Sequence, residues 1–219
     1  MRTFFTKTLA FASAVILLSS CAGSYKSITP ENMHYEVKSE SNGVVLQYRL
    51  GVLGEHGNKK YVKKESKNFI KVAAVKLTNN TANTIDVSND VKFFSGPNQF
   101  SSLEPKLAHA RLKQSVPIYL LYTLLTPLRL SETTYVNGIK QETRVIFPVG
   151  LIVGPGITLY NMITAGTANN KLLSDLQKYS VLNKQIAPGE TLHGIVVIPN
   201  GGYNPLSIKV GEEELQTKQ

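Results

Sequence analysis

The chain has 219 residues, with 24 lysines and arginines against 15 acidic residues and a single cysteine. This length suits one domain, or one domain with a large insertion. A single cysteine excludes a disulfide within the chain, so the fold depends on its apolar core. The positive charge suggests nucleic acid as a partner, but the lysines are scattered and the N-terminal segment argues against that class.

The N-terminal segment has the parts of a secretion signal. Residues 1–8 carry Arg2 and Lys7 and no acidic residue, and residues 9–18 are almost wholly apolar. Small residues follow. A positive region, a short apolar run and small residues before a cleavage site are typical of a secretory signal. We therefore predict a signal peptide over residues 1–20.

The end of this segment, Leu18-Ser19-Ser20-Cys21, resembles the lipobox of bacterial lipoproteins. The resemblance implies that the thiol of Cys21 is acylated, that the preceding peptide bond is cleaved, and that Cys21 becomes the mature N-terminus. An ordinary secretory signal would instead leave an unpaired thiol in an oxidising compartment. An uncleaved anchor is the other alternative, but the apolar run is about half the ~20 residues that span a bilayer. The residue after the cysteine is Ala22 and not an aspartate. By the same resemblance, this implies that the lipoprotein is located in the outer membrane.

The next part of the chain predicts a tether and then strands. Residues 21–32 are mostly small and polar, and we expect them to form the lipidated tether. The β-formers of residues 43–50 and 69–77 predict two strands. Residues 61–65 predict a short edge strand whose neighbouring lysines discourage aggregation, with contact to anionic lipid as the alternative. Residues 84–94 predict one long strand or a strand pair.

The C-terminal part again predicts strands, over residues 191–198 and 206–210. Short strands separated by Asn, Gly and Pro turns are typical of an all-β sandwich. Residues 72–81, and residues 186–198 with their Pro-Gly-Glu turn, resemble strands of the immunoglobulin-like domains of bacterial envelope lipoproteins. The resemblance implies a fold and carries no active site.

Residues 101–183 differ in composition from these flanks and predict an apolar, partly helical insertion. Residues 102–114 lack glycine and predict a helix. Asn137-Gly138 is a strong signal for the turn of a β-hairpin. Residues 168–182 have leucines and a tyrosine at helical spacing, and predict an amphipathic helix.

Two strongly apolar stretches within the insertion, residues 116–130 and 145–165, allow three interpretations. They are core packed on the sandwich, or a membrane-interacting hairpin that dips into the leaflet beside the lipid anchor, or a surface for self-association or another partner. Gly150 and Gly154 have the spacing that lets helix backbones approach closely. Pro155 directly after them argues against a continuous helix. The candidate membrane or partner surface consists of Tyr119, Leu121, Tyr122, Leu125, Phe147, Gly150, Leu151, Ile152 and Gly154.

Signals for catalysis are weak throughout the sequence. The four histidines are not paired at the spacing of metal ligands, and the cysteine is assigned to lipidation. The glycines of residues 150–156 are not followed by the Lys-Ser/Thr of a phosphate loop. Asp86 and Asp90 lack the dense oxygen ligands of a calcium loop. We therefore predict no enzyme, no metal site and no cofactor.

Together these patterns predict a mainly β protein of the α+β class. An immunoglobulin-like sandwich over residues 33–210 is interrupted by the insertion 101–183 and followed by a polar tail, 211–219. We expect a non-enzymatic lipoprotein of the bacterial envelope that is held in the outer membrane by acylated Cys21. Its role would be binding or assembly at the membrane, with another envelope protein or a second copy as partner and no nucleic acid.

The alternative is a carrier of a small apolar ligand, or an enzyme, that uses a pocket between the sandwich and the insertion. The two hypotheses differ in what lies at residues 116–165. An enclosed apolar cavity beneath these residues would favour the carrier. An exposed apolar ridge would favour contact with a partner or a membrane.

Overall fold

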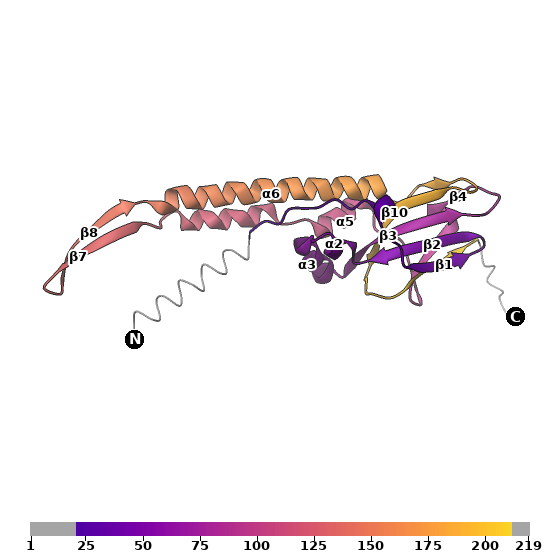
Figure 1. Cartoon of the computed structure of the whole chain (residues 1–219), viewed down its shortest axis with the longest axis horizontal. Helices are drawn as coiled ribbons and strands as arrows, with labels where there is room; N and C mark the ends of the chain where they lie inside the picture. The colour runs from indigo at the N-terminus through magenta and orange to yellow at the C-terminus, as the bar shows by residue number, and fades with distance from the viewer. Residues whose placement is uncertain (1–20, 212–219) are drawn as a thin grey trace. The chain divides into compact units, whose positions relative to one another are not determined.

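A computed structural model describes residues 21–211 (Figure 1). The predicted signal peptide and all but the first residue of the predicted polar tail lie outside these described residues. The protein is of the mixed α+β class, with several antiparallel sheets and one long apolar helix, as predicted at this level. Its residues form two compact units. We call Gln114–Ala168 with residues 21–24 the apolar unit, and Tyr25–Lys113 with residues 169–211 the sheet unit.

The largest sheet of the sheet unit has four antiparallel strands in the order β1-β2-β3-β10. The central strand β3 carries an almost unbroken apolar run and is buried along most of its length. A strand that is covered on both faces needs such a run, because neither face meets water. The strands are β1 (Val37–Ser41), β2 (Val44–Leu50), β3 (Ile70–Asn79) and β10 (Thr191–Pro199).

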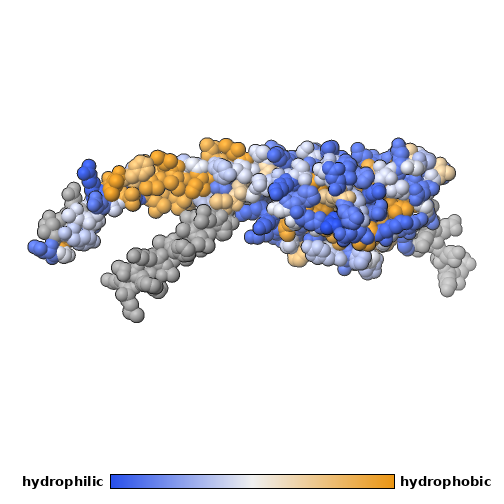
Figure 2. Space-filling view, viewed as in Figure 1, coloured by the Kyte–Doolittle hydropathy of each residue, from blue (hydrophilic) through white to orange (hydrophobic). Residues whose placement is uncertain are grey.

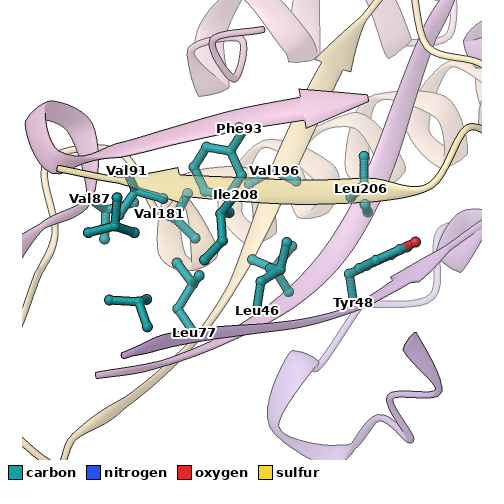
Figure 3. Packing of buried hydrophobic residues seen from close by; sticks show 14 of the residues in the cluster. Leu46, Tyr48, Leu77, Val87, Val91, Phe93, Val181, Val196, Leu206 and Ile208 are labelled. Atoms are coloured by element: carbon teal, nitrogen blue, oxygen red, sulfur yellow. The ribbon is translucent and has the colours of Figure 1, made fainter. Parts of the chain in front are cut away.

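A smaller antiparallel sheet, in the order β11-β5-β6, shares its hydrophobic core with the four-stranded sheet. Alternate residues of each strand enter this core, among them Leu46 and Leu77 from one sheet and Phe93 and Ile208 from the other (Figure 3). The strands are β5 (Val91–Ser95), β6 (Asn98–Phe100) and β11 (Leu206–Val210), and a further pair joins β4 (Ile85–Asp86) to β9 (Gln185–Ile186).

The other face of the four-stranded sheet is covered by short helices, several of which contact β3 or β10. Val72 and Ala74 of β3 point to this side and are fully buried. The helices are η1 (Pro30–Asn32), α2 (Val52–Glu55), α3 (Lys59–Asn68) and α5 (Pro105–Leu112). Helix α5 confirms the helix predicted within residues 102–114.

The edge strand predicted over residues 61–65 is wrong, because these residues lie in α3. Tyr61 and Glu65, four residues apart, are both buried, whereas Lys63 and Lys67 are exposed. This spacing places the buried pair on one face of a helix, and a strand would require a period of two. The strand pair predicted over residues 84–94 is instead β4, a one-turn helix α4 (Val87–Asp90) and β5.

The apolar unit contains η2 (Val116–Leu125), a hairpin of β7 (Leu130–Val136) and β8 (Ile139–Phe147), and the first part of α6 (Val149–Tyr179). The hairpin turn predicted at Asn137-Gly138 is confirmed, and both residues have the positive φ that this turn needs. Helix α6 continues without interruption from the apolar unit into the sheet unit.

The expectation that Pro155 prevents a continuous helix is wrong, since α6 passes through it. A proline inside a helix removes one backbone hydrogen bond and costs about 3 kcal/mol. Gly154 and Thr158 flank the proline on the buried side of α6. Packing on that side stabilises the helix across the proline, which itself is exposed.

Candidate functional site

The apolar unit has two long segments without a charged residue. None occurs between Lys113 and Arg129, or between Arg144 and Lys171. The first segment contains η2, and the second contains the part of α6 that belongs to the apolar unit. In a protein surrounded by water, such apolar segments would be expected to lie buried in a core.

These segments expose their largest side chains. Ile152 of α6 is 63% exposed and Leu124 of η2 is 73% exposed. Figure 2 shows a hydrophobic patch over the N-terminal half of α6. Single exposed apolar residues are normal on a soluble protein, but a continuous patch marks an interaction surface. We call the exposed large apolar residues of η2 and α6 the apolar surface: Ile118, Leu120, Leu121, Leu124, Leu151, Ile152, Val153, Leu159, Tyr160 and Ile163.

The buried side of α6 carries small residues in the same stretch. An added Cβ at Gly150 would lie 2.1 Å from the carbonyl oxygen of Leu125, and one at Gly154 would lie 3.2 Å from the carbonyl oxygen of Tyr122. The backbone after and within η2 therefore rests directly on α6. Glycine at these two positions is what permits this close approach.

A small cluster completes the contact between η2 and α6. Tyr119 and Tyr122 stack with their ring centroids 6.4 Å apart, and Ala165 of α6 is fully buried beside them. Ala22, Leu125 and Met162 pack against this cluster. The apolar unit is thus closed by a few small and aromatic residues, and its bulkier aliphatic residues remain outside.

The nine residues predicted as a surface therefore occupy two environments. Leu121, Phe147, Leu151 and Ile152 are exposed. Tyr119, Tyr122, Gly150 and Gly154 are buried between η2 and α6, and Leu125 is half-buried there. The sequence reasoning did not name Leu124, Leu159 or Tyr160, which are among the most exposed. Sorting residues 149–168 by helical position into a large and a small face would have found the two on α6.

The segment that follows Cys21 is fixed to the apolar unit. The backbone N–H of Ala22 donates to the Oδ1 atom of Asn161 on α6. Gly23 and the side-chain amide of Gln114 exchange two hydrogen bonds, of 2.9 and 2.7 Å. Cys21 itself is half-buried. The predicted acylation site therefore lies next to Asn161, at one end of the apolar surface.

Polar side chains within the uncharged segments bond to the backbone of their own helix. The hydroxyl of Thr123 donates to the carbonyl of Leu120 at 2.6 Å, and that of Thr158 donates to the carbonyl of Gly154 at 2.9 Å. The amide of Asn161 donates to the carbonyl of Ile157 at 2.8 Å. These bonds satisfy the side chains without water, as a hydrocarbon environment requires.

Among the described residues, α6 is long and apolar enough to cross a membrane. The core helix of a soluble protein passes the same test, but such a helix is mostly buried, and only 28% of this apolar window is. A signal sequence would also pass, but α6 lies far from the N-terminus. The first part of α6 is thus a long apolar helix segment that is largely exposed.

The sheet unit offers polar hollows. One, of about 710 Å³, is open to solvent and includes Glu104, Lys106, Gln177 and Lys184 among its lining residues. Within residues 21–211 no group of three histidine, cysteine or acidic side chains is placed to hold a metal ion. At residues 116–165 the structure has an exposed apolar ridge.

One buried ion pair distinguishes the interior of the sheet unit. Glu65 and Lys71 are 1% and 5% exposed, with 3.7 Å between their Oε2 and Nζ atoms. The N–H of Val72 donates to Oε1 of Glu65 at 2.7 Å, and the Lys71 ammonium lies 4.0 Å from the ring centre of Tyr203. Burial raises the pKa of Glu65, although the bond from Val72 and the charge of Lys71 act to lower it. This pair is an internal structural contact, covered from solvent.

The comparisons with known proteins give no family. No protein-family model, no curated protein and no solved structure matches the chain. The functional argument therefore rests on the residues and their geometry.

Proposed function

We propose that this protein is a non-enzymatic lipoprotein of the bacterial envelope, with a binding or assembly role at the membrane. Its sheet unit would be a relative of the immunoglobulin-like sandwich, anchored through acylated Cys21. The carrying observation is that the segment after Cys21 is bound to Asn161 and Gln114, directly beside the apolar surface. The proposed site of lipid attachment therefore lies close to exposed apolar side chains.

The energetics favour two anchors acting together. A single acyl chain gives only marginal membrane binding, and stable anchoring takes a second signal. Moving one exposed leucine or isoleucine from water into an apolar phase contributes about 1.5–3 kcal/mol. Leu121, Leu151 and Ile152, each more than half exposed, would supply that second signal.

The proposed sandwich is supported by two antiparallel sheets that share one core. It is also supported by the turn at Pro188-Gly189, which leads into the central part of that core through β10. Outer-membrane placement remains part of the proposal and rests on the residue after the cysteine, Ala22.

The first test is acylation of the full chain in bacterial cells. Cells fed a fatty acid with a terminal alkyne should label the wild type, and Cys21→Ser should lose the label completely. Residues 22–219, made without signal or lipid, should still float with phospholipid vesicles through the apolar surface. Full labelling of Cys21→Ser, or a soluble wild type without label, would overturn the proposal.

A further inference from the structure

We propose that the apolar unit crosses the bilayer. In this arrangement η2 and the first part of α6 lie in the hydrocarbon, with the turn of the β7–β8 hairpin at one membrane face and acylated Cys21 at the other. The inference rests on the proposed lipoprotein function and adds a topology to it. Four observations carry it: length, charge, polar satisfaction and the position of the lipid.

The helical part of the apolar surface is longer than one leaflet is deep. From Asn161 to Val149 the helix rises about 18 Å at 1.5 Å per residue. One leaflet supplies about half of the ~30 Å hydrocarbon core, so this helix does not fit within a single leaflet along the membrane normal. Exposed Phe147, Ile146 and Val145 continue the apolar surface beyond Val149, at the base of the hairpin.

The absence of a polar face argues against a helix that lies flat in the interface. Interfacial helices present a strongly charged face to water. The part of α6 up to Ala168 has no charged residue. Its smaller face is covered by η2 through Gly150 and Gly154, and its larger face is aliphatic. No face of this segment is therefore polar enough to lie against water in the membrane interface.

Charged and aromatic residues mark the two ends. Arg129 and Arg144 are exposed at the base of the hairpin, where β7 pairs Glu132 with Arg144. Arginines at the end of a span can extend to the headgroups. At the other end Tyr160, which is 68% exposed, lies beside Asn161, as expected of an aromatic belt at the interface.

The hairpin itself belongs in water. Glu132, Lys140 and Arg144 are exposed on its strands, and a two-stranded sheet has open edges that are not tolerated in lipid. The acylated residue lies at the opposite end, beside Asn161, so its fatty chains would run alongside α6 toward Val149. Both ends of the surface therefore have the chemistry of a membrane boundary.

The test labels introduced cysteines with a maleimide. Cys21 is the single native cysteine, and once acylated it does not react. The acylated full chain carrying Thr84→Cys in the sheet unit and Lys140→Cys in the hairpin is reconstituted in sealed phospholipid vesicles. Both positions are exposed. A membrane-impermeant maleimide is added from outside, and labels per molecule are counted by intact mass. If the chain crosses the bilayer, one of the two cysteines faces the outside in either orientation, so each molecule takes one label. After detergent opens the vesicles, each molecule takes two.

A third variant tests contact with hydrocarbon. Ile152→Cys should stay unlabelled in vesicles and react fully once detergent is added. Molecules of the double variant with two labels or none before detergent, while the protein stays acylated and vesicle-bound, would overturn the crossing and leave the lipoprotein proposal intact. Immediate labelling of Ile152→Cys would also overturn it. An unacylated protein that does not bind vesicles would contradict the lipoprotein proposal itself.

Discussion

The two parts of helix α6 follow opposite rules. From Asn169 onward, in the sheet unit, Leu172 and Leu176 are buried while Lys171 and Lys178 are exposed. Up to Ala168, in the apolar unit, the large aliphatic side chains are exposed and glycine, threonine and alanine are buried. One continuous helix thus carries a water-adapted part and a part with its large apolar face outward.

The contacts made by each part agree with this division. In the sheet unit, Asp175 accepts hydrogen bonds of 2.9 Å from the Tyr25 hydroxyl and the Ile28 N–H. In the apolar unit, Thr158 and Asn161 bond to the backbone of their own helix. Side-chain hydrogen bonds between elements hold the part of α6 in the sheet unit. Close backbone packing holds the part in the apolar unit. The difference agrees with the proposal that one part of α6 lies in water and the other in lipid.

The largest expected effect compares Leu172→Ala with Ile152→Ala. Leu172 is fully buried, and removing a buried leucine side chain costs about 2–5 kcal/mol. Ile152 is 63% exposed, so its truncation should change the free energy of unfolding in water by less than about 0.5 kcal/mol. Urea unfolding of residues 22–219 measures both. Equal costs would mean that Ile152 is covered in solution and would remove the distinction between the two parts.

In membrane binding, a substitution in the apolar-unit part of α6 should have the larger effect, and one in the sheet-unit part the smaller. Ile152→Lys places a charge in the proposed hydrocarbon segment, which costs about 2.5–3.5 kcal/mol at the centre of a span. Vesicle binding should fall by roughly a hundredfold. Asn170→Lys, exposed on the same helix but in the sheet unit, should leave it unchanged. Equal binding by both variants would contradict the role of the apolar surface.

Much of the secondary structure was predictable because its signals are local. The strand β3 follows from the apolar run of residues 69–77, and the hairpin turn follows from Asn137-Gly138. Helix α3 was missed because lysines surround only two buried residues, Tyr61 and Glu65, and their burial depends on α5 and β3. A pattern with so few apolar positions does not distinguish an edge strand from a helix.

The candidate site was predictable as a segment but less so as a surface. Apolar composition identified residues 116–165, yet four of the nine predicted residues are buried. Composition does not say which side of a uniformly apolar helix is covered. The answer came from Gly150 and Gly154, whose role is to seat η2, and from the continuity of α6 across Pro155. Both depend on contacts between residues far apart in the sequence.

A smaller effect separates two glycines of the same helix. Gly150→Ala would force a Cβ to within 2.1 Å of the Leu125 carbonyl oxygen, so η2 must shift, at a cost of about 1–3 kcal/mol. Gly156→Ala meets nothing within 4 Å and should stabilise α6 by up to about 1 kcal/mol. Thermal unfolding in detergent, followed by circular dichroism, compares them. A neutral Gly150→Ala would contradict the close packing of η2 on α6.

The smallest effect concerns the pH dependence of unfolding that comes from Glu65, a buried carboxyl group of the sheet unit. Burial raises the pKa of Glu65 in the folded chain, so the folded state holds this proton more tightly than the unfolded state. The resulting stabilisation is complete below the unfolded pKa and is lost as pH rises through the folded pKa.

Glu65→Gln keeps an acceptor for the Val72 N–H and cannot ionise. The change also removes the carboxylate that faces Lys71, an attraction that acts to lower the pKa of Glu65 but is outweighed by burial. As pH rises from about 4 to 7, the difference in unfolding free energy should therefore move in favour of Glu65→Gln. Denaturant unfolding at several pH values measures it. A difference that is flat, or that moves toward the wild type, would mean that Lys71 and the Val72 bond outweigh desolvation, and that the sheet unit holds this charge without penalty.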